Sequence, residues 1–352
     1  MIRKTNKSEF TNELKAMLTK PIPKHLPTTT DRRAIIIDFM AYARKVPIKK
    51  QCLKTYNDFF TSLWSTFASL SETCNRVDIV FDVYNENSVK ASERSRRIKK
   101  EGNETILSCS IPVDIDRFWP VAKNKVALQQ LFTKWTIEKV YREDFGKSLF
   151  LGGSHKESDA MCYSIINSSV NTERLLECSH EEADDRIFFH VNHAIKVGRN
   201  TSVVIASPDT DMFVAATHHF NILKKYFALE ELWFVSGRSG SRICFPIHDL
   251  ANDLDPELTE VLPAIHALTG CDTASKVGTK SRAVKEGPES YPLLYSFGRD
   301  ELSEEMISNA EKFLIKCITK HNVDTFDELR YIIYHEKHLQ FDIERFPPTS
   351  TD

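Results

Sequence analysis

The sequence lacks three features that would place it in a functional class at once. It contains no apolar run of membrane-spanning length, and its polar start MIRKTNKSEF has no apolar signal-peptide core. Its eight cysteines are scattered, without a CxxC or paired Cys/His spacing, which argues against a zinc site and favours reduced thiols. It also has no excess of basic charge, because the formal net charge is -2. We expect an intracellular protein, nuclear or cytoplasmic, that does not bind membranes and contacts nucleic acid only through local patches.

Short apolar segments indicate buried strands. They show little polar alternation, as is typical of a parallel sheet that is covered on both faces. Three segments have this composition: RAIIID (33–38), VDIVFD (77–82) and TSVVIA (201–206). Between them, apolar residues at three- and four-residue steps from Leu53 to Leu70, and the sequence EEADDRIFFHVNHAIKVG (181–198), predict amphipathic helices.

The order of strands and helices predicts an α/β fold with a parallel central sheet flanked by helices. ELWFV and RICFPI, on either side of GRSGS (237–241), predict a hairpin at the sheet edge. A helical C-terminal half is expected from Asp249. Residues 1–30 are polar and carry three prolines, so we expect an amphipathic lead-in and an extended linker there rather than core.

Acidic residues stand at or just after the ends of the three predicted strands. The carboxyl ends of parallel strands meet at one edge of a sheet, where open α/β folds bind ligands. Further acids begin the helix HEEADD and lie in LTGCD. The candidate catalytic and metal-binding residues are Asp38, Asp82, Glu182, Asp184, Asp185, Asp209, Asp211 and Asp272.

Each of these acids has an ordinary structural explanation. Aspartate at a strand end is often a turn residue or an N-cap, and acids at a helix start complement the helix dipole. Taken together, acids from five segments at one edge favour a cation site. Carboxylates without an organised His or Cys cluster suit Mg²⁺ or Mn²⁺, and two such ions serve phosphodiester hydrolysis.

The ordered motifs carry a resemblance to a known family. After Asp38 they are VFD (80–82), EADD (182–185), SPDTD (207–211) and LTGCDTASKVGTKSRA (268–283). Over roughly residues 32–285 the chain resembles the 5′-nuclease (flap endonuclease, PIN-like) superfamily. It looks most similar to the Asteroid-type or transposon-associated branch, with its LTGCDT signature. The resemblance implies that the eight acids bind two divalent metal ions, Mg²⁺ or Mn²⁺.

The resemblance also implies a domain organisation. A PIN-like nuclease domain would cover 31–285, with an arch over the single strand at 84–106, after the N-terminal extension 1–30. A helical C-terminal region would cover 286–352. Relatives of this branch continue past a segment similar to its FPPTSTD, which implies truncation. The turn with Lys276, Gly278 and Lys280 would grip duplex backbone, although it has one glycine where the familiar form has two. A plain helix-turn-helix corner is the alternative for this turn.

A basic segment supports contact with phosphates independently of the resemblance. SVKASERSRRIKK, from Ser88 to Lys100, contains six basic residues and one acid in a slightly acidic chain. Phosphate contact is the natural use of such a segment, and a solvated helix face is the alternative. The candidate nucleic-acid contacts here are Lys90, Arg94, Arg96 and Arg97.

These patterns predict a divalent-metal-dependent nuclease that acts on branched or single-stranded nucleic acid, with DNA favoured over RNA. The alternative from another class is an inactive nucleic-acid-binding or scaffold protein that retains the fold. A phosphatase of the haloacid-dehalogenase type is disfavoured, because it needs DxD directly after the first strand and Asp38 is followed by Phe39 and Met40.

Overall fold

The structure is a computed structural model. It describes residues 7–28, 32–84, 110–143, 145–153, 155, 158, 160–180, 183–237, 242–271, 277, 283–284, 288–336 and 346–350. The chain divides into two compact units. The first unit comprises Met1–Pro21, Asp209–Asn221 and Ile247–Asp352, and the second comprises Ile22–Pro208 and Ile222–Pro246. The domain boundaries expected at residues 30 and 285 stay predictions from the sequence.

The second unit is built on an eight-stranded sheet with the order β5-β4-β3-β2-β1-β6-β7-β8. The strands are β1 (Arg33–Asp38), β2 (Arg76–Val80), β3 (Ser148–Gly152), β4 (Cys162–Ile166), β5 (Ser169–Thr172), β6 (Ser202–Ala206), β7 (Glu231–Ser236) and β8 (Ile243–Pro246). The five central strands, from β3 to β7 in the sheet order, are parallel, and β4, β5 and β8 are antiparallel to their neighbours. The predicted parallel central sheet and the β7–β8 hairpin are confirmed.

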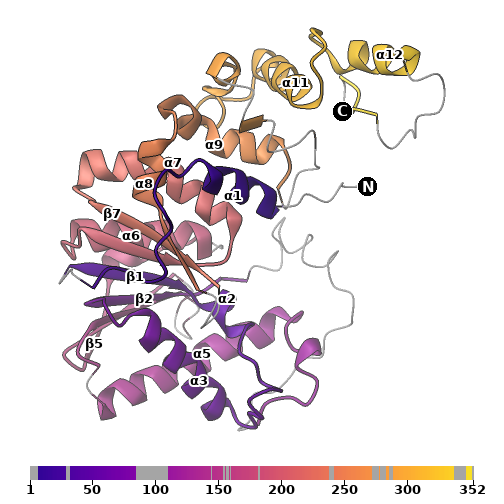
Figure 1. Ribbon diagram of the computed structural model, residues 1–352. Coiled ribbons are helices and arrows are strands. Elements are labelled where there is room, and N and C mark those ends of the chain that lie inside the picture. The colour runs from indigo at the N-terminus through magenta and orange to yellow at the C-terminus, as the bar shows by residue number, and fades with distance from the viewer. Residues whose placement is uncertain are drawn as a thin grey trace. The chain divides into compact units, whose positions relative to one another are not determined.

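Helices cover both faces of this sheet. They are α2 (Phe39–Ala43), α3 (Tyr56–Leu70), α5 (Ala122–Arg142) and α6 (Ala183–Lys196), with 3-10 turns η1 (Ile115–Arg117) and η2 (Arg174–Leu176). In Figure 1, α3 and α5 lie against one face of the sheet and α6 lies against the other. The α3 side holds an aromatic cluster in which Phe60 and Phe67 both contact Phe132. Helix α3 starts later than Leu53 because Thr55 and Asp58 form a capping box.

Every regular element in the described part of the first unit is a helix. Its elements are α1 (Lys7–Ala16), α7 (Thr210–Phe227, as far as Asn221 in this unit), α8 (Ile247–Asp253), α9 (Pro256–Leu268), η3 (Pro288–Leu294), α11 (Glu304–Ile318) and α12 (Phe326–Glu336). The expected helical C-terminal half is therefore observed in the described residues. No helix among the described residues is long and apolar enough to cross a membrane.

The N-terminal region contributes more to the core than the sequence indicates. Phe10 and Leu14 of α1 are fully buried, and the Phe10 ring stacks on His266 with centroids 5.4 Å apart. In the second unit, the buried Arg33 side chain donates a hydrogen bond to the Pro27 carbonyl, which ties the segment before β1 to the sheet. The expectation that residues 1–30 lie outside the core is wrong for these positions, because two apolar side chains one helical turn apart give α1 a face to bury.

Three strands lacked a clear sequence signal. Strand β3 lies next to β2, and β4 and β5 form a hairpin at the end of the sheet. The hairpin turn consists of Asn167 and Ser168, with φ of 50° and 60°. Left-handed φ at both central residues is typical of a type I′ turn, for which Asn-Gly is the recognisable sequence. Because serine stands in place of that glycine, the pattern did not predict this hairpin.

Candidate functional site

Asp38 and Asp82 lie at the carboxyl edge of the sheet, on neighbouring parallel strands. Asp38 is the last residue of β1 and is aligned with Val80 of β2, and Asp82 follows two residues later. On the other side of β1, Ile37 is aligned with Ala206 at the end of β6, and Ser207 follows. The parallel register therefore brings the ends of three strands to one edge.

Hydrogen bonds from Ala41 and Ser207 hold the Asp38 carboxylate. Its Oδ1 accepts a bond of 3.0 Å from the backbone N–H of Ala41, which caps α2. Its Oδ2 accepts a bond of 3.3 Å from the hydroxyl of Ser207. The capping role anticipated as the ordinary explanation is therefore present. The Ser207 bond also fixes the carboxylate with respect to the end of β6.

Asp82 joins the sheet edge to the start of α6. Its Oδ1 accepts a hydrogen bond of 3.1 Å from the backbone N–H of Ala183, the first residue of α6. Its Oδ2 accepts a bond of 3.0 Å from the hydroxyl of Tyr84. A negative charge at this end of a helix is favoured by the helix dipole. The carboxylate is thus fixed from both sides.

The two acids at the start of α6 differ in their surroundings. Asp184 directly follows the residue that Asp82 holds, and it is half-buried. Asp185 is exposed, and its Oδ2 lies 4.0 Å from Nδ1 of His180. Asp184 is therefore the next residue after Ala183, which donates to Asp82, and Asp185 lies at the surface.

Asp209 and Asp211 belong to the first unit. Asp209 Oδ1 accepts a hydrogen bond of 3.0 Å from the backbone N–H of Asp211, so Asp209 caps α7. Asp211 Oδ1 lies 2.7 Å from Nε2 of His266, whose side chain is 8% exposed. Sequence reasoning gave His266 no role, but here the ring orients the Asp211 carboxylate. Its position ten residues after the start of α9 carried no signal of this pairing.

The other predicted site residues lie outside the described residues. They are Glu182, Asp272, Lys90, Arg94, Arg96, Arg97, Lys276, Gly278 and Lys280. The arch segment 84–106 is described only at Tyr84. These assignments stay predictions from the sequence.

The chemistry of the described acids suits a hard divalent cation. Asp38, Asp82 and Asp184 offer carboxylate oxygens, the donors that Mg²⁺ and Mn²⁺ prefer. A carboxylate has several lone-pair positions, so an oxygen that accepts a hydrogen bond can also bind a cation. In the described part of the chain, no group of three or more His, Cys, Asp or Glu residues is arranged to hold a metal ion. Glu182 and Asp272, two of the expected ligands, lie outside that part.

A buried charged network, not anticipated from the sequence, connects strand β2 to helix α6. Asp78 of β2 is fully buried, and both its oxygens accept hydrogen bonds of 2.7 Å from the Arg76 guanidinium. Nδ1 of His190, on α6, lies 2.7 Å from Asp78 Oδ2. Burial alone would raise the pKa of Asp78. The Arg76 charge and the hydrogen bonds from Arg76 and His190 outweigh burial and hold that pKa below its ordinary value.

The same network fixes α6 on the sheet. The Arg76 guanidinium also lies over the Phe150 ring of β3, 3.9 Å from its centroid. His193, one turn after His190, is buried, and burial together with the Arg76 charge lowers its pKa to about 4. A neutral His193 therefore packs beside the charged pair at neutral pH. Because α6 is held in this way, its first residue is placed to bond Asp82.

Two glycines at the end of β3 give α6 room to approach. A Cβ on Gly152 would lie 2.5 Å from Nε2 of His190, and one on Gly153 would lie 2.5 Å from an Arg186 guanidinium nitrogen. Gly153 has φ of +94°, a conformation that glycine adopts without strain. Arg186 in turn donates hydrogen bonds to the carbonyls of His180 and Cys178, before α6. The pair GG in LFLGG, together with the lone Asp78 inside an apolar strand, is the sequence signal for this packing.

The comparisons with known proteins leave the family open. No protein-family model matches the chain, and no curated protein matches it. Function is therefore inferred from the residues at the sheet edge.

Proposed function

We propose that the chain is a divalent-metal-dependent nuclease that hydrolyses phosphodiester bonds in branched or single-stranded nucleic acid. The observation that supports this proposal is the position of Asp38 and Asp82 at the carboxyl ends of neighbouring parallel strands. Open α/β sheets bind their ligands at this edge. Hydrogen bonds fix both carboxylates, and the start of α6 brings Asp184 next to the residue that Asp82 bonds.

Asp38, Asp82 and Asp184 would contribute carboxylates to a site for Mg²⁺ or Mn²⁺ that also needs Glu182 and Asp272, which lie outside the described residues. A pair of such ions, when bound, stabilises the attacking and leaving oxygens of phosphodiester hydrolysis. Ser207 and the Ala41 N–H orient Asp38, and Tyr84 and the Ala183 N–H orient Asp82. Carboxylates that are fixed in advance need no reorganisation when a cation binds. The remaining candidate ligands, predicted from the sequence, are Glu182, Asp185, Asp209, Asp211 and Asp272.

A nucleic-acid-binding or scaffold protein without catalytic activity is the second candidate. Asp38 caps α2, Asp82 accepts a bond from the first residue of α6, and Asp209 caps α7. An inactive protein would keep these acids for the stability that helix caps provide, about 1 kcal/mol each. The acids therefore have a use that does not require a cation.

Cleavage of labelled substrates separates the two candidates. A 5′-flap, a hairpin and a plain single strand, each prepared as DNA and as RNA, should be incubated with the protein in Mn²⁺, in Mg²⁺ and in excess EDTA. We expect cleavage of at least one substrate with either ion and none in EDTA. Equal cleavage in EDTA would contradict the metal mechanism. Binding without cleavage of any substrate would support the scaffold.

The basic segment Ser88–Lys100 should supply phosphate contacts. Replacing Arg94, Arg96 and Arg97 by Ala should weaken binding to all sequences and flatten the slope of log affinity against log salt, because fewer counterions are released. The matched control removes three exposed cations of the second unit: Lys134, Arg142 and Arg174. Both triple variants lose the same charge. An equal salt slope for the two variants would mean that the basic segment makes no specific contact.

A further inference from the structure

A cavity of about 380 Å³ in the second unit has three basic and three hydroxyl side chains among its lining residues. Its walls are the end of α2 with the following loop, the outer part of α3, and the β7–β8 hairpin. The polar groups that matter are Lys45, Lys50, Arg242, Tyr42, Ser62 and Thr66. Parts of the chain far apart in sequence therefore bring three positive charges to one hollow.

The described lining of this cavity contains three basic side chains and no acidic one. Within the described residues, the half-buried Arg242 guanidinium has no hydrogen-bond or ion-pair partner. A partly desolvated guanidinium without an acceptor is costly, so an anionic ligand would be favoured here.

We propose that this cavity binds a phosphate group. A guanidinium donates two parallel hydrogen bonds to phosphate oxygens, and lysines add compact positive charge. The Ser62 hydroxyl donates to Gln51 Oε1 and the Thr66 hydroxyl donates to the Ser62 carbonyl, so the basic side chains are the donors for the phosphate oxygens. Lys45 lies beside the Tyr42 ring, with Nζ 5.8 Å from its centroid, which places this ammonium at the cavity wall. The ligand is a phosphorylated molecule or the phosphorylated end of a nucleic acid.

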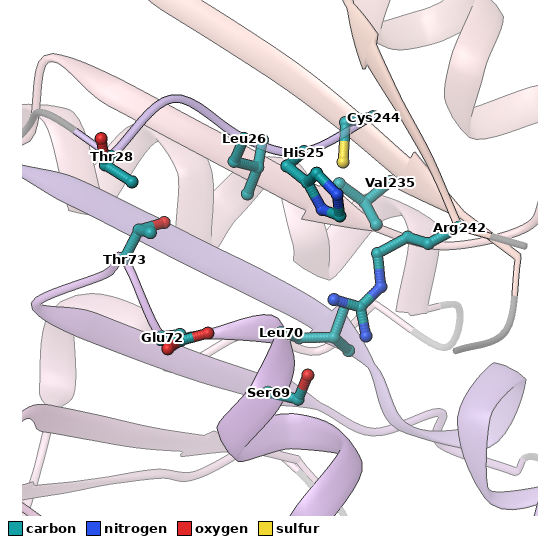
Figure 2. Close-up of a pocket in the computed structure, with 10 residues that line it drawn as sticks. All are labelled: His25, Leu26, Thr28, Ser69, Leu70, Glu72, Thr73, Val235, Arg242 and Cys244. Carbon is teal, nitrogen blue, oxygen red and sulfur yellow. The ribbon is translucent and has the colours of Figure 1, made fainter. Parts of the chain in front are cut away.

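A neighbouring cavity of about 460 Å³ shares Arg242 but fits a phosphate less well. Figure 2 shows Arg242 reaching from the start of β8 toward Leu70 at the end of α3, with Glu72 farther along the lining. The Glu72 carboxylate would repel a phosphate. The first cavity contains Lys45 and Lys50 and none of its described lining residues is acidic, so we assign the phosphate site to it.

The phosphate site is distinct from the acids of the sheet edge. The described acids of the sheet edge, Asp38, Asp82 and Asp184, do not line the cavity. Phosphate binding here does not depend on whether the chain cleaves nucleic acid.

Calorimetric titration with pyrophosphate in EDTA tests the site, because any cation site stays empty under these conditions. We expect saturable binding with one site per chain. Arg242→Gln should weaken it about tenfold or more, since hydrogen bonds to a charged partner are the strong ones. Lys50→Gln, which changes an exposed residue and should not affect folding, should weaken it by a smaller factor. The control Lys134→Gln removes an exposed charge on α5 and should leave the affinity unchanged.

Absence of saturable pyrophosphate binding to the unmodified chain would overturn the proposal. So would equal affinities for the unmodified chain, Arg242→Gln and Lys50→Gln. To identify which kind of molecule carries the phosphate, the affinity of one short oligonucleotide should be measured with a 5′-phosphate and with a 5′-hydroxyl. Tighter binding of the phosphorylated form that disappears in Arg242→Gln assigns the site to a nucleic-acid end. Equal binding of the two forms, with pyrophosphate still bound, assigns it to a small phosphorylated molecule.

Discussion

Asp38→Asn and Asp82→Asn should each lower the rate of metal-dependent cleavage by orders of magnitude and leave the melting temperature nearly unchanged. Each change removes the charge of one hard ligand. The amide oxygen of asparagine still accepts the hydrogen bond from the Ala41 or Ala183 N–H, and asparagine is as good an N-cap as aspartate. The measurements are single-turnover cleavage in Mn²⁺ and thermal unfolding in EDTA.

Asp58→Asn is the matched control for these variants. Asp58 accepts the N–H of Thr55 in the capping box of α3, is exposed, and lies in the same unit. The same isosteric change there should leave cleavage unaffected. If Asp38→Asn and Asp82→Asn cleave as fast as Asp58→Asn, the two acids are caps and the nuclease proposal is wrong. If Asp38→Ala and Asp82→Ala lose stability while the Asn variants do not, capping is confirmed separately from catalysis.

Asp78→Ala should cost the folded state about 3–5 kcal/mol, because it leaves the buried Arg76 guanidinium without its partner. The loss should appear as a lower midpoint in urea at pH 7. The double variant Arg76→Met with Asp78→Leu should recover much of the stability, since well-packed apolar side chains can replace a buried ion pair. If the double variant regains stability, the cost of Asp78→Ala comes from the unpaired Arg76 charge. If it does not, the cost comes from other lost contacts.

The control for Asp78→Ala is Glu138→Gln on α5. Glu138 and Lys134 are 4.0 Å apart, and their side chains are 52% and 75% exposed. Water screens such a pair, so its loss should cost less than about 1 kcal/mol. If Asp78→Ala costs no more than Glu138→Gln, the buried network does not hold α6 on the sheet. The placement of Ala183 against Asp82 would then need another cause.

The positions of the central strands β1, β2, β6 and β7 and of the strand-end acids could be predicted from the sequence, whereas that of β3 was not. Uninterrupted apolar segments such as RAIIID become strands buried on both faces, and their spacing along the chain requires parallel crossovers. Once the strands are parallel, Asp38 and Asp82 must share one edge. The first residue of a helix was harder to predict. In α3 it is set by the capping box of Thr55 and Asp58, which requires both side chains to bond the backbone at once.

The contacts between distant residues could not be predicted, because a pattern along the chain does not specify which residues meet. The pairing of Asp78 with His190 joins residues 112 positions apart, and that of Asp211 with His266 joins residues 55 positions apart. Composition and periodicity determined the strands, the amphipathic helices and the acids at the sheet edge, since these depend on near neighbours. Tertiary packing alone decided the burial of Phe10, the buried charge on Asp78 and the cationic cavity around Arg242, since each depends on the desolvation and the partners that the folded chain provides.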